Sequence, residues 1–193
     1  MGIMKVKRAM ILLLTIGIIV VGGCVRYPDG HNGNGEAIYQ LEITVEVAGE
    51  INTDEGIYYI VFDADSDSTD GPGDDVDLWD DDYYYIKLDW MESFYFAQVN
   101  DSESYFNEGN ITGSNKFQIT IAISDLGDPT KIDINVLTTD SDNHTYDSLS
   151  DGYFFISTSW GSSETISDFE DDSGDGGEDF DIVEVTAVVT TLY

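Results

Sequence analysis

The sequence contains a single cysteine, Cys24, among 193 residues. A disulfide framework is therefore excluded, and the folded chain must gain its stability from an apolar core or from bound ions. Basic residues are also few, since seven Lys and Arg stand against 39 Asp and Glu, for a formal net charge of −32. Nucleic acids and anionic lipid surfaces would repel such a chain, which excludes both as partners. A charge this negative is typical of halophilic proteins, whose self-repulsion is screened by salt.

Helical patterns are missing as well, because no stretch of ten or more residues holds a helical period of apolar side chains. Residues 39–47 instead alternate apolar and polar side chains, and residues 57–62 form a continuous apolar run that predicts a strand buried on both faces. Short β-type runs separated by turn residues continue along the chain. We predict an all-β domain over residues 38–193, a single mostly antiparallel β-sandwich of jelly-roll or related topology with about eight strands. The predicted strands are 39–47, 57–62, 83–88, 94–99, 117–123, 132–136, 153–156 and 182–190.

The first 23 residues have the features of a targeting segment. Basic residues precede the apolar run Ala9–Val21, which is shorter than the roughly 20 residues that a membrane span needs. The small residues before Cys24 resemble the lipobox of prokaryotic lipoproteins, which implies that Cys24 is lipidated and becomes the first residue. We therefore expect a signal peptide (1–23), a flexible tether (24–37) and an extracytoplasmic domain anchored to the membrane. The alternative is an uncleaved anchor with an incidental cysteine.

An acidic loop, Asp63–Asp82, holds ten aspartates between two β-like runs. Carboxylates this dense repel one another unless a cation binds among them, and Ca²⁺ prefers six to eight oxygen ligands. We predict calcium coordination by Asp63, Asp65, Asp67 and Asp74, completed by Asp70 or Asp75 and a backbone carbonyl. The spacing matches only the start of an EF-hand loop, because Ser68 replaces the turn glycine. A solvated acidic loop is the alternative explanation.

Residues 117–142 carry a second resemblance. Ile121–Gly127, Ile134–Val136 and Thr139–Asp142 resemble the late strands of the DOMON and family 9 carbohydrate-binding-module superfamily. The resemblance implies a β-sandwich that binds a ligand, usually a glycan and in some branches haem, often with structural calcium. A haem would need axial ligands such as Met91 and His144, but a core methionine and a loop histidine explain these two residues better, so we expect no haem.

Aromatic residues crowd the region after the acidic loop, and an exposed aromatic face beside carboxylates can bind sugars. The candidate ligand-binding residues are Trp79, Tyr83, Tyr85, Trp90 and Tyr95. Alternate strand residues must be buried, and the sequence leaves open which of them are. Only two histidines occur, and no catalytic grouping can be assembled, so we expect no enzyme. The predicted function is non-catalytic carbohydrate binding. The alternative is a structural cell-surface, envelope or adhesion protein, and the oligomeric state stays open.

Overall fold

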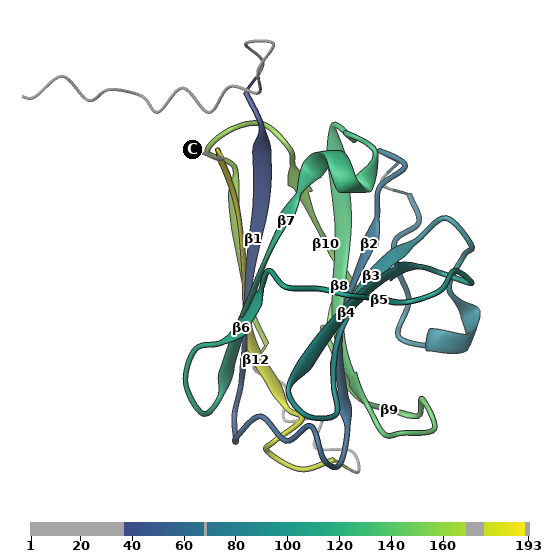
Figure 1. Ribbon diagram of the computed structural model, residues 1–193, viewed down its shortest axis with the longest axis vertical. Helices are drawn as coiled ribbons and strands as arrows, with labels where there is room; N and C mark the ends of the chain where they lie inside the picture. The colour runs from purple at the N-terminus through teal and green to yellow at the C-terminus, as the bar shows by residue number, and fades with distance from the viewer. Residues whose placement is uncertain (1–36, 68, 169–175, 192–193) are drawn as a thin grey trace, which may run out of the picture.

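The computed structural model describes residues 37–67, 69–168 and 176–191, in which two antiparallel sheets face each other (Figure 1). One sheet has the order β11-β12-β1-β7-β6, and the other has the order β10-β8-β2-β3-β4-β5, with β9 also paired to β8. The prediction of a mostly antiparallel β-sandwich is thereby confirmed. The order β8-β2-β3-β4 is that of a Greek key. The strands are β1 (Tyr39–Val47), β2 (Ile57–Asp63), β3 (Tyr84–Asp89), β4 (Ser93–Gln98), β5 (Ser104–Tyr105), β6 (Gly109–Ile111), β7 (Lys116–Ala122), β8 (Lys131–Thr139), β9 (Thr145–Ser148), β10 (Phe154–Ser157), β11 (Ser163–Ser167) and β12 (Ile182–Thr191).

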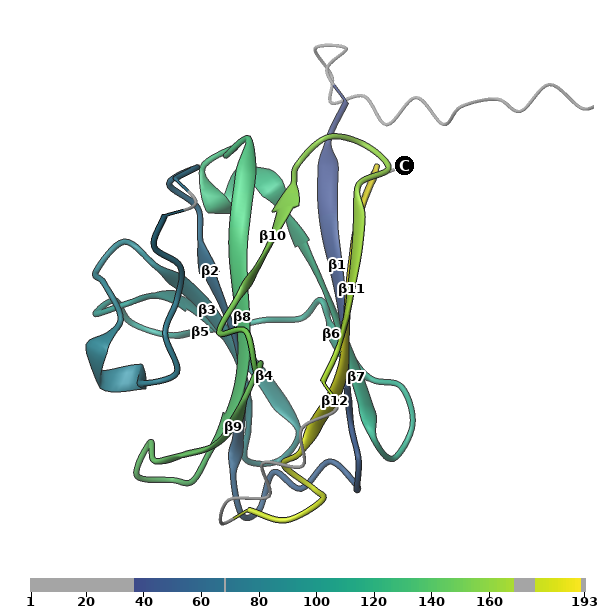
Figure 2. The ribbon, with the colours of Figure 1, turned by 180° about the vertical axis from the view of Figure 1, so that it is seen from behind.

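The eight predicted strands all occur, each within a few residues of its predicted ends. The structure adds the short strands β5, β6, β9 and β11, whose residues show too little apolar alternation to predict a strand. Strands β9 and β10 both pair with the edge of β8 that faces away from β2 (Figure 2). Two 3₁₀ turns, η1 (Val76–Leu78) and η2 (Ile123–Leu126), complete the described elements.

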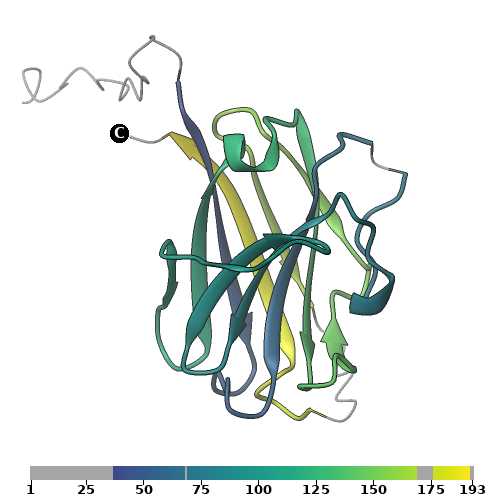
Figure 3. The same cartoon turned by 45° about the vertical axis from the view of Figure 1, so that its right-hand side comes forward.

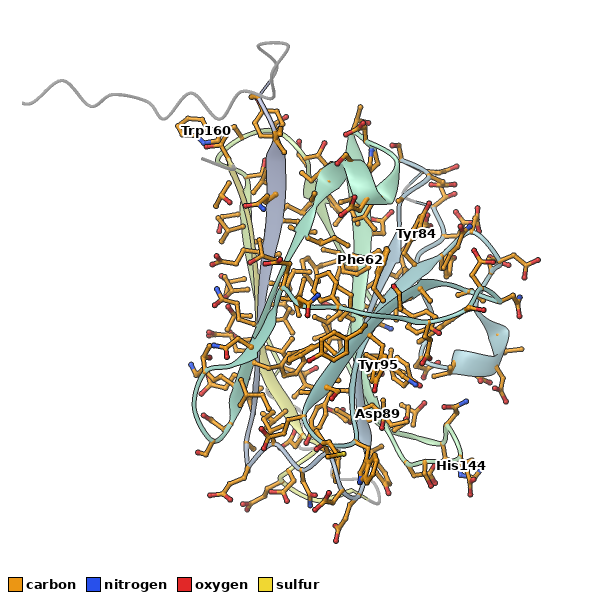
Figure 4. The ribbon with its side chains drawn as sticks, viewed as in Figure 1. Phe62, Tyr84, Asp89, Tyr95, His144 and Trp160 are labelled. Atoms are coloured by element: carbon orange, nitrogen blue, oxygen red, sulfur yellow. The ribbon has the colours of Figure 1, made fainter. Side chains whose placement is uncertain are left out.

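The main core lies between the sheets. On β1, Leu41, Ile43 and Val45 are fully buried, whereas the residues between them are half-buried. Tyr58, Ile60 and Phe62 of β2 face them from the opposite sheet, and Phe62 lies between the two sheets in Figure 4. Full burial of one such side chain contributes about 1.5–3 kcal/mol, so this shared layer supplies most of the stabilisation.

The seven-stranded sheet is also buried on its outer face. A covering loop, residues 64–67 and 69–83, lies against this face and carries η1 (Figure 3). Asn135 Nδ2 donates to Pro72 O (3.1 Å), and Trp79 Nε1 donates to Gly73 O (3.0 Å). The first bond ties the loop to β8, and the second lies within the loop and fixes its course. With the loop held there, β2 is buried on both faces, as its continuous apolar run predicts.

Both ends of the described sandwich lie close together, since β1 begins beside the end of the antiparallel strand β12. Residues 1–36, with the predicted signal peptide, Cys24 and nearly all of the tether, lie outside the described residues, as do Ser68 and residues 169–175 and 192–193. Within the described ranges, no helix has the length and apolar character to cross a membrane.

Candidate functional site

A second, smaller apolar cluster lies on the outer face of the seven-stranded sheet. Tyr59 and Val61 come from β2, Leu137 comes from β8, and Trp79 and Tyr83 come from the covering loop. Their exposed fractions are 8% or less. The loop therefore shields side chains on a face that an antiparallel sheet commonly leaves open to water.

A groove of about 490 Å³ opens beside this cluster. Its aromatic wall is formed by Tyr59, Trp79 and Tyr85, whose ring centroids lie 5.4–6.0 Å apart. Edge-to-face and tilted contacts of this kind hold each ring in one orientation. The volume is within the usual range for small-molecule sites. The lining residues are Ile57, Tyr59, Val76, Trp79, Tyr85, Lys87, Asp89, Val99, Asn100, Glu103, Ser141 and Asn143.

The groove also holds a charged network centred on Lys87. Lys87 Nζ lies 3.2 Å from Asp89 Oδ2 and 2.9 Å from Glu103 Oε1. The Tyr85 hydroxyl donates to the same Glu103 oxygen at 3.0 Å. Lys87 Nζ also lies 5.5 Å from the centroid of the Tyr95 ring, in the range of a cation–π contact. Figure 4 shows Tyr95 on the same side of the molecule as Asp89. One cation is thus shared by two carboxylates, which leaves a net negative charge.

The protonation states in the groove follow from burial and from this network. Burial opposes the charge of Lys87, but its hydrogen bonds to Glu103 and Asp89 outweigh that effect and raise its pKa. Burial and the nearby carboxylates raise the pKa of Tyr59 and of Tyr85 well above the ordinary value. At neutral pH the Lys87 ammonium therefore stays charged, and the Tyr59 and Tyr85 phenols stay protonated.

The structure brings together only some of the five predicted aromatic residues. Trp79 and Tyr85 line the groove, and Tyr95 borders it through Lys87. Tyr83 is buried within the outer cluster and does not line the groove. Trp90 is 65% exposed in the turn between β3 and β4 and does not line the groove.

Several groove residues were missed by sequence reasoning. Tyr59 could have been found, because it alternates with the core residues of β2 and lies opposite Lys87 of β3. Asp89 and Glu103 had no signal that separates them from the other acidic residues. Asn143 comes from the turn before β9, and its Oδ1 accepts a hydrogen bond from the Tyr59 hydroxyl at 3.4 Å.

The predicted calcium ligands follow the course of the covering loop. Asp63 is buried at the end of β2, and burial raises its pKa to about 6. Asp65, Asp67, Asp70, Asp74 and Asp75 are exposed. Oδ1 of Asp63, of Asp65 and of Asp67 each accepts the amide N–H two residues further on. In the described ranges, no three His, Cys, Asp or Glu side chains gather closely enough to hold a metal ion.

Two polar residues on β8 were not predicted as part of any site. Asp133 is the direct cross-strand partner of Asp63, and Asn135 lies two residues further along the same face. Both side chains are buried, and their Oδ1 atoms accept no hydrogen bond from a described residue. Asp133 Oδ1 still forms an ion pair with Lys131 Nζ at 3.1 Å, whereas Asn135 Oδ1 has no such contact with a described residue. A buried acceptor left in the state of Asn135 Oδ1 costs about 1–3 kcal/mol.

The two nominated haem ligands do not sit in an enclosed pocket. Met91 is 68% exposed in the β3–β4 turn, so the expectation of a core methionine was wrong. His144 is an exposed turn residue, and its Nδ1 lies 2.9 Å from Asp140 Oδ2. Figure 4 shows His144 at the edge of the molecule.

No family model matches the chain, and no curated protein matches it in sequence. The resemblance of residues 117–142 to the DOMON superfamily therefore stays a prediction.

Proposed function

We propose that the chain is a non-catalytic carbohydrate-binding module whose glycan binds in the groove beside Tyr85. The observation that carries this proposal is one groove that combines three aromatic rings with the Lys87–Asp89–Glu103 network. A sugar ring has apolar C–H faces and a rim of hydroxyl groups, so it needs both kinds of surface.

Different groove residues contact different parts of the sugar. Tyr85 and Trp79 offer apolar ring surface, while Asp89 and Glu103 accept hydrogen bonds from sugar hydroxyls. Hydrogen bonds to charged groups contribute about 1.5–3 kcal/mol, so each carboxylate is worth roughly tenfold to a hundredfold in affinity. The charge left over after Lys87 is shared disfavours acidic sugars, because a uronate or sulfate would meet excess negative charge.

The proposal includes an extracytoplasmic location, with the domain held at the membrane by lipid on Cys24. The support is the basic start, the short apolar run and the small residues before the one cysteine. Replacing Cys24 by Ser should release the protein from the membrane fraction. If the variant stays there with residues 1–23 uncleaved, the lipoprotein proposal fails.

The test of the glycan proposal is a glycan array followed by calorimetric titration of any sugar that binds the full chain. We expect Glu103→Gln and Tyr85→Ala to weaken binding at least tenfold. Trp90→Ala is the matched control, because Trp90 is an exposed aromatic residue outside the groove. If Trp90→Ala removes binding and the groove variants keep it, the groove is not the site. If no sugar on the array binds, the alternative of a structural cell-surface protein is favoured.

A further inference from the structure

The outer face of the seven-stranded sheet holds a second polar feature, separate from the groove. Asp63 of β2 and Asp133 of β8 are direct cross-strand partners, with exposed fractions of 4% and 2%. Like charges directly opposite each other in a sheet repel, and burial removes the water that would screen them. A pair of this kind is stabilised by a positive partner or by a proton on one carboxyl group.

Lys131 supplies part of that positive charge. Its Nζ lies 3.1 Å from Asp133 Oδ1 and 3.3 Å from Oδ2, and 4.5 Å above the Phe155 ring. Asp65 and Asp67 lie near enough to raise the pKa of Asp133, although burial is the larger cause. One lysine therefore faces several carboxylates, and the local charge stays negative.

Two buried oxygen atoms at this place accept no hydrogen bond from a described residue, and one of them has an ion-pair contact alone. Asn135 donates its Nδ2 to Pro72 O and Gly73 O of the covering loop, which leaves its Oδ1 without a hydrogen bond. Asp133 Oδ1 also lacks one, since its contact with Lys131 is an ion pair outside hydrogen-bond geometry. Acceptors that lack donors, held between a strand and a loop, are suited to a cation.

We propose that Asp63, Asp133 and the Asn135 side-chain oxygen bind a divalent cation, Ca²⁺ by preference, beneath the covering loop. The donors are all oxygen, which Ca²⁺ prefers over the nitrogen and sulfur ligands of transition metals. The carboxylates number two rather than three, so loop carbonyls and water complete the shell. Of the loop aspartates predicted from the sequence, only Asp63 belongs to this site. The inference is independent of glycan binding, because no groove-lining residue is a ligand.

The test is calorimetric titration of the full chain with CaCl₂ at a fixed high NaCl concentration, alongside thermal unfolding with chelator or with Ca²⁺. We expect one saturable site. The double variant Asp63→Asn, Asp133→Asn should bind at least tenfold more weakly. The control Asp74→Asn, Asp75→Asn makes the same change of charge at exposed positions of the covering loop and should keep the site.

Lys131→Met gives a second measurement that leaves both carboxylates in place. Removing the competing ammonium should raise the affinity for Ca²⁺ severalfold, with stability restored by the ion. If Lys131→Met only destabilises the fold and gains no affinity, Lys131 is the complete counter-ion and the proposal is overturned. Equal Ca²⁺ responses of the two double variants, or no saturable binding, would also overturn it.

Discussion

The two outer faces of the sandwich differ although the strands behind them are built in the same way. On the five-stranded sheet, Glu42 and Thr44 of β1 are half-exposed between fully buried neighbours. On the seven-stranded sheet, every residue from Tyr58 to Asp63 of β2 is buried, as are those from Ile132 to Thr139 of β8. The difference comes from the covering loop. Alternation therefore marks an open face, and a continuous apolar run marks a covered one.

The covered face also holds the residues of both proposed sites. Asp63, Asp133 and Asn135 interrupt an otherwise apolar surface, and buried polar groups are retained only when partners satisfy them. The open face has polar residues at the positions where water already satisfies them. A polar residue thus carries functional information on the covered face and little on the open one.

The largest expected effect comes from placing a charge on each face. Val61→Asp puts a carboxylate at a fully buried position beneath the loop, next to other acidic groups. We expect a loss of about 3–5 kcal/mol in the free energy of unfolding, as for other unpaired buried charges. Thr44→Asp on β1 should cost about 1 kcal/mol or less. Denaturant unfolding measures both, and similar costs would mean that the loop does not seal the face.

A smaller effect is expected from shortening an apolar side chain on each face. Leu137→Ala removes a fully buried side chain from the outer cluster and should cost about 2–5 kcal/mol. Val188→Ala changes a half-buried residue on the open face of β12, where water reaches the site, and should cost about 1 kcal/mol or less. Comparable losses in denaturant unfolding would contradict the existence of a second core.

The attachment of the loop can be tested with two glycines. A Cβ on Gly71 would lie 2.5 Å from the Tyr153 ring, whereas a Cβ on Gly73 would meet no atom within 4 Å. Gly71→Ala should therefore cost about 1–3 kcal/mol and speed proteolysis of the loop. Gly73→Ala should leave both unchanged. If the two variants are cleaved equally fast, the loop is not held through the Gly71–Tyr153 contact.

The β-sandwich was predictable because the strand signal is local. Apolar and polar residues alternate strictly in 39–47 and in 117–123. The strands that they form, β1 and β7, pair with each other, and their apolar residues lie in the main core. The short strands β5 and β11 were not predictable, because their pairing depends on neighbours far along the chain rather than on their own composition. The run 57–62 predicted a covered face but not what covers it.

The candidate sites were less predictable for a related reason. Trp79 and Tyr85 could be named from composition, but Tyr59, Lys87 and Glu103 join them only through strand register and loop closure. Asp133 sits in an ordinary alternating strand, where an acidic residue predicts a wet face. Its burial becomes apparent only in the folded structure, where it is 2% exposed and pairs with Asp63.

The smallest expected effect concerns Asp147 of β9, at the edge of the covered sheet. Burial is the main cause that raises the pKa of this carboxyl to about 6, with contributions from Asp168 and Asp181. Because the folded-state pKa lies above the ordinary value of 3.8, the folded chain binds the proton more tightly than the unfolded chain. The contribution of this carboxyl to the stability of the fold is therefore complete below about pH 4. It is lost as the pH rises to about 6, and it does not change further at higher pH.

Asp147→Asn removes this titration and keeps an oxygen that can accept the Ile182 N–H, at 2.7 Å in the structure. We expect the variant to match or exceed the parent in stability at pH 7 and to lose that advantage near pH 4.5. The effect should be modest, because the carboxyl is half-buried and solvent screens it. Urea unfolding of both proteins between pH 4.5 and 7.5 gives the difference in slope. Parallel slopes would show that the general charge repulsion of this acidic chain, rather than Asp147, sets its pH dependence.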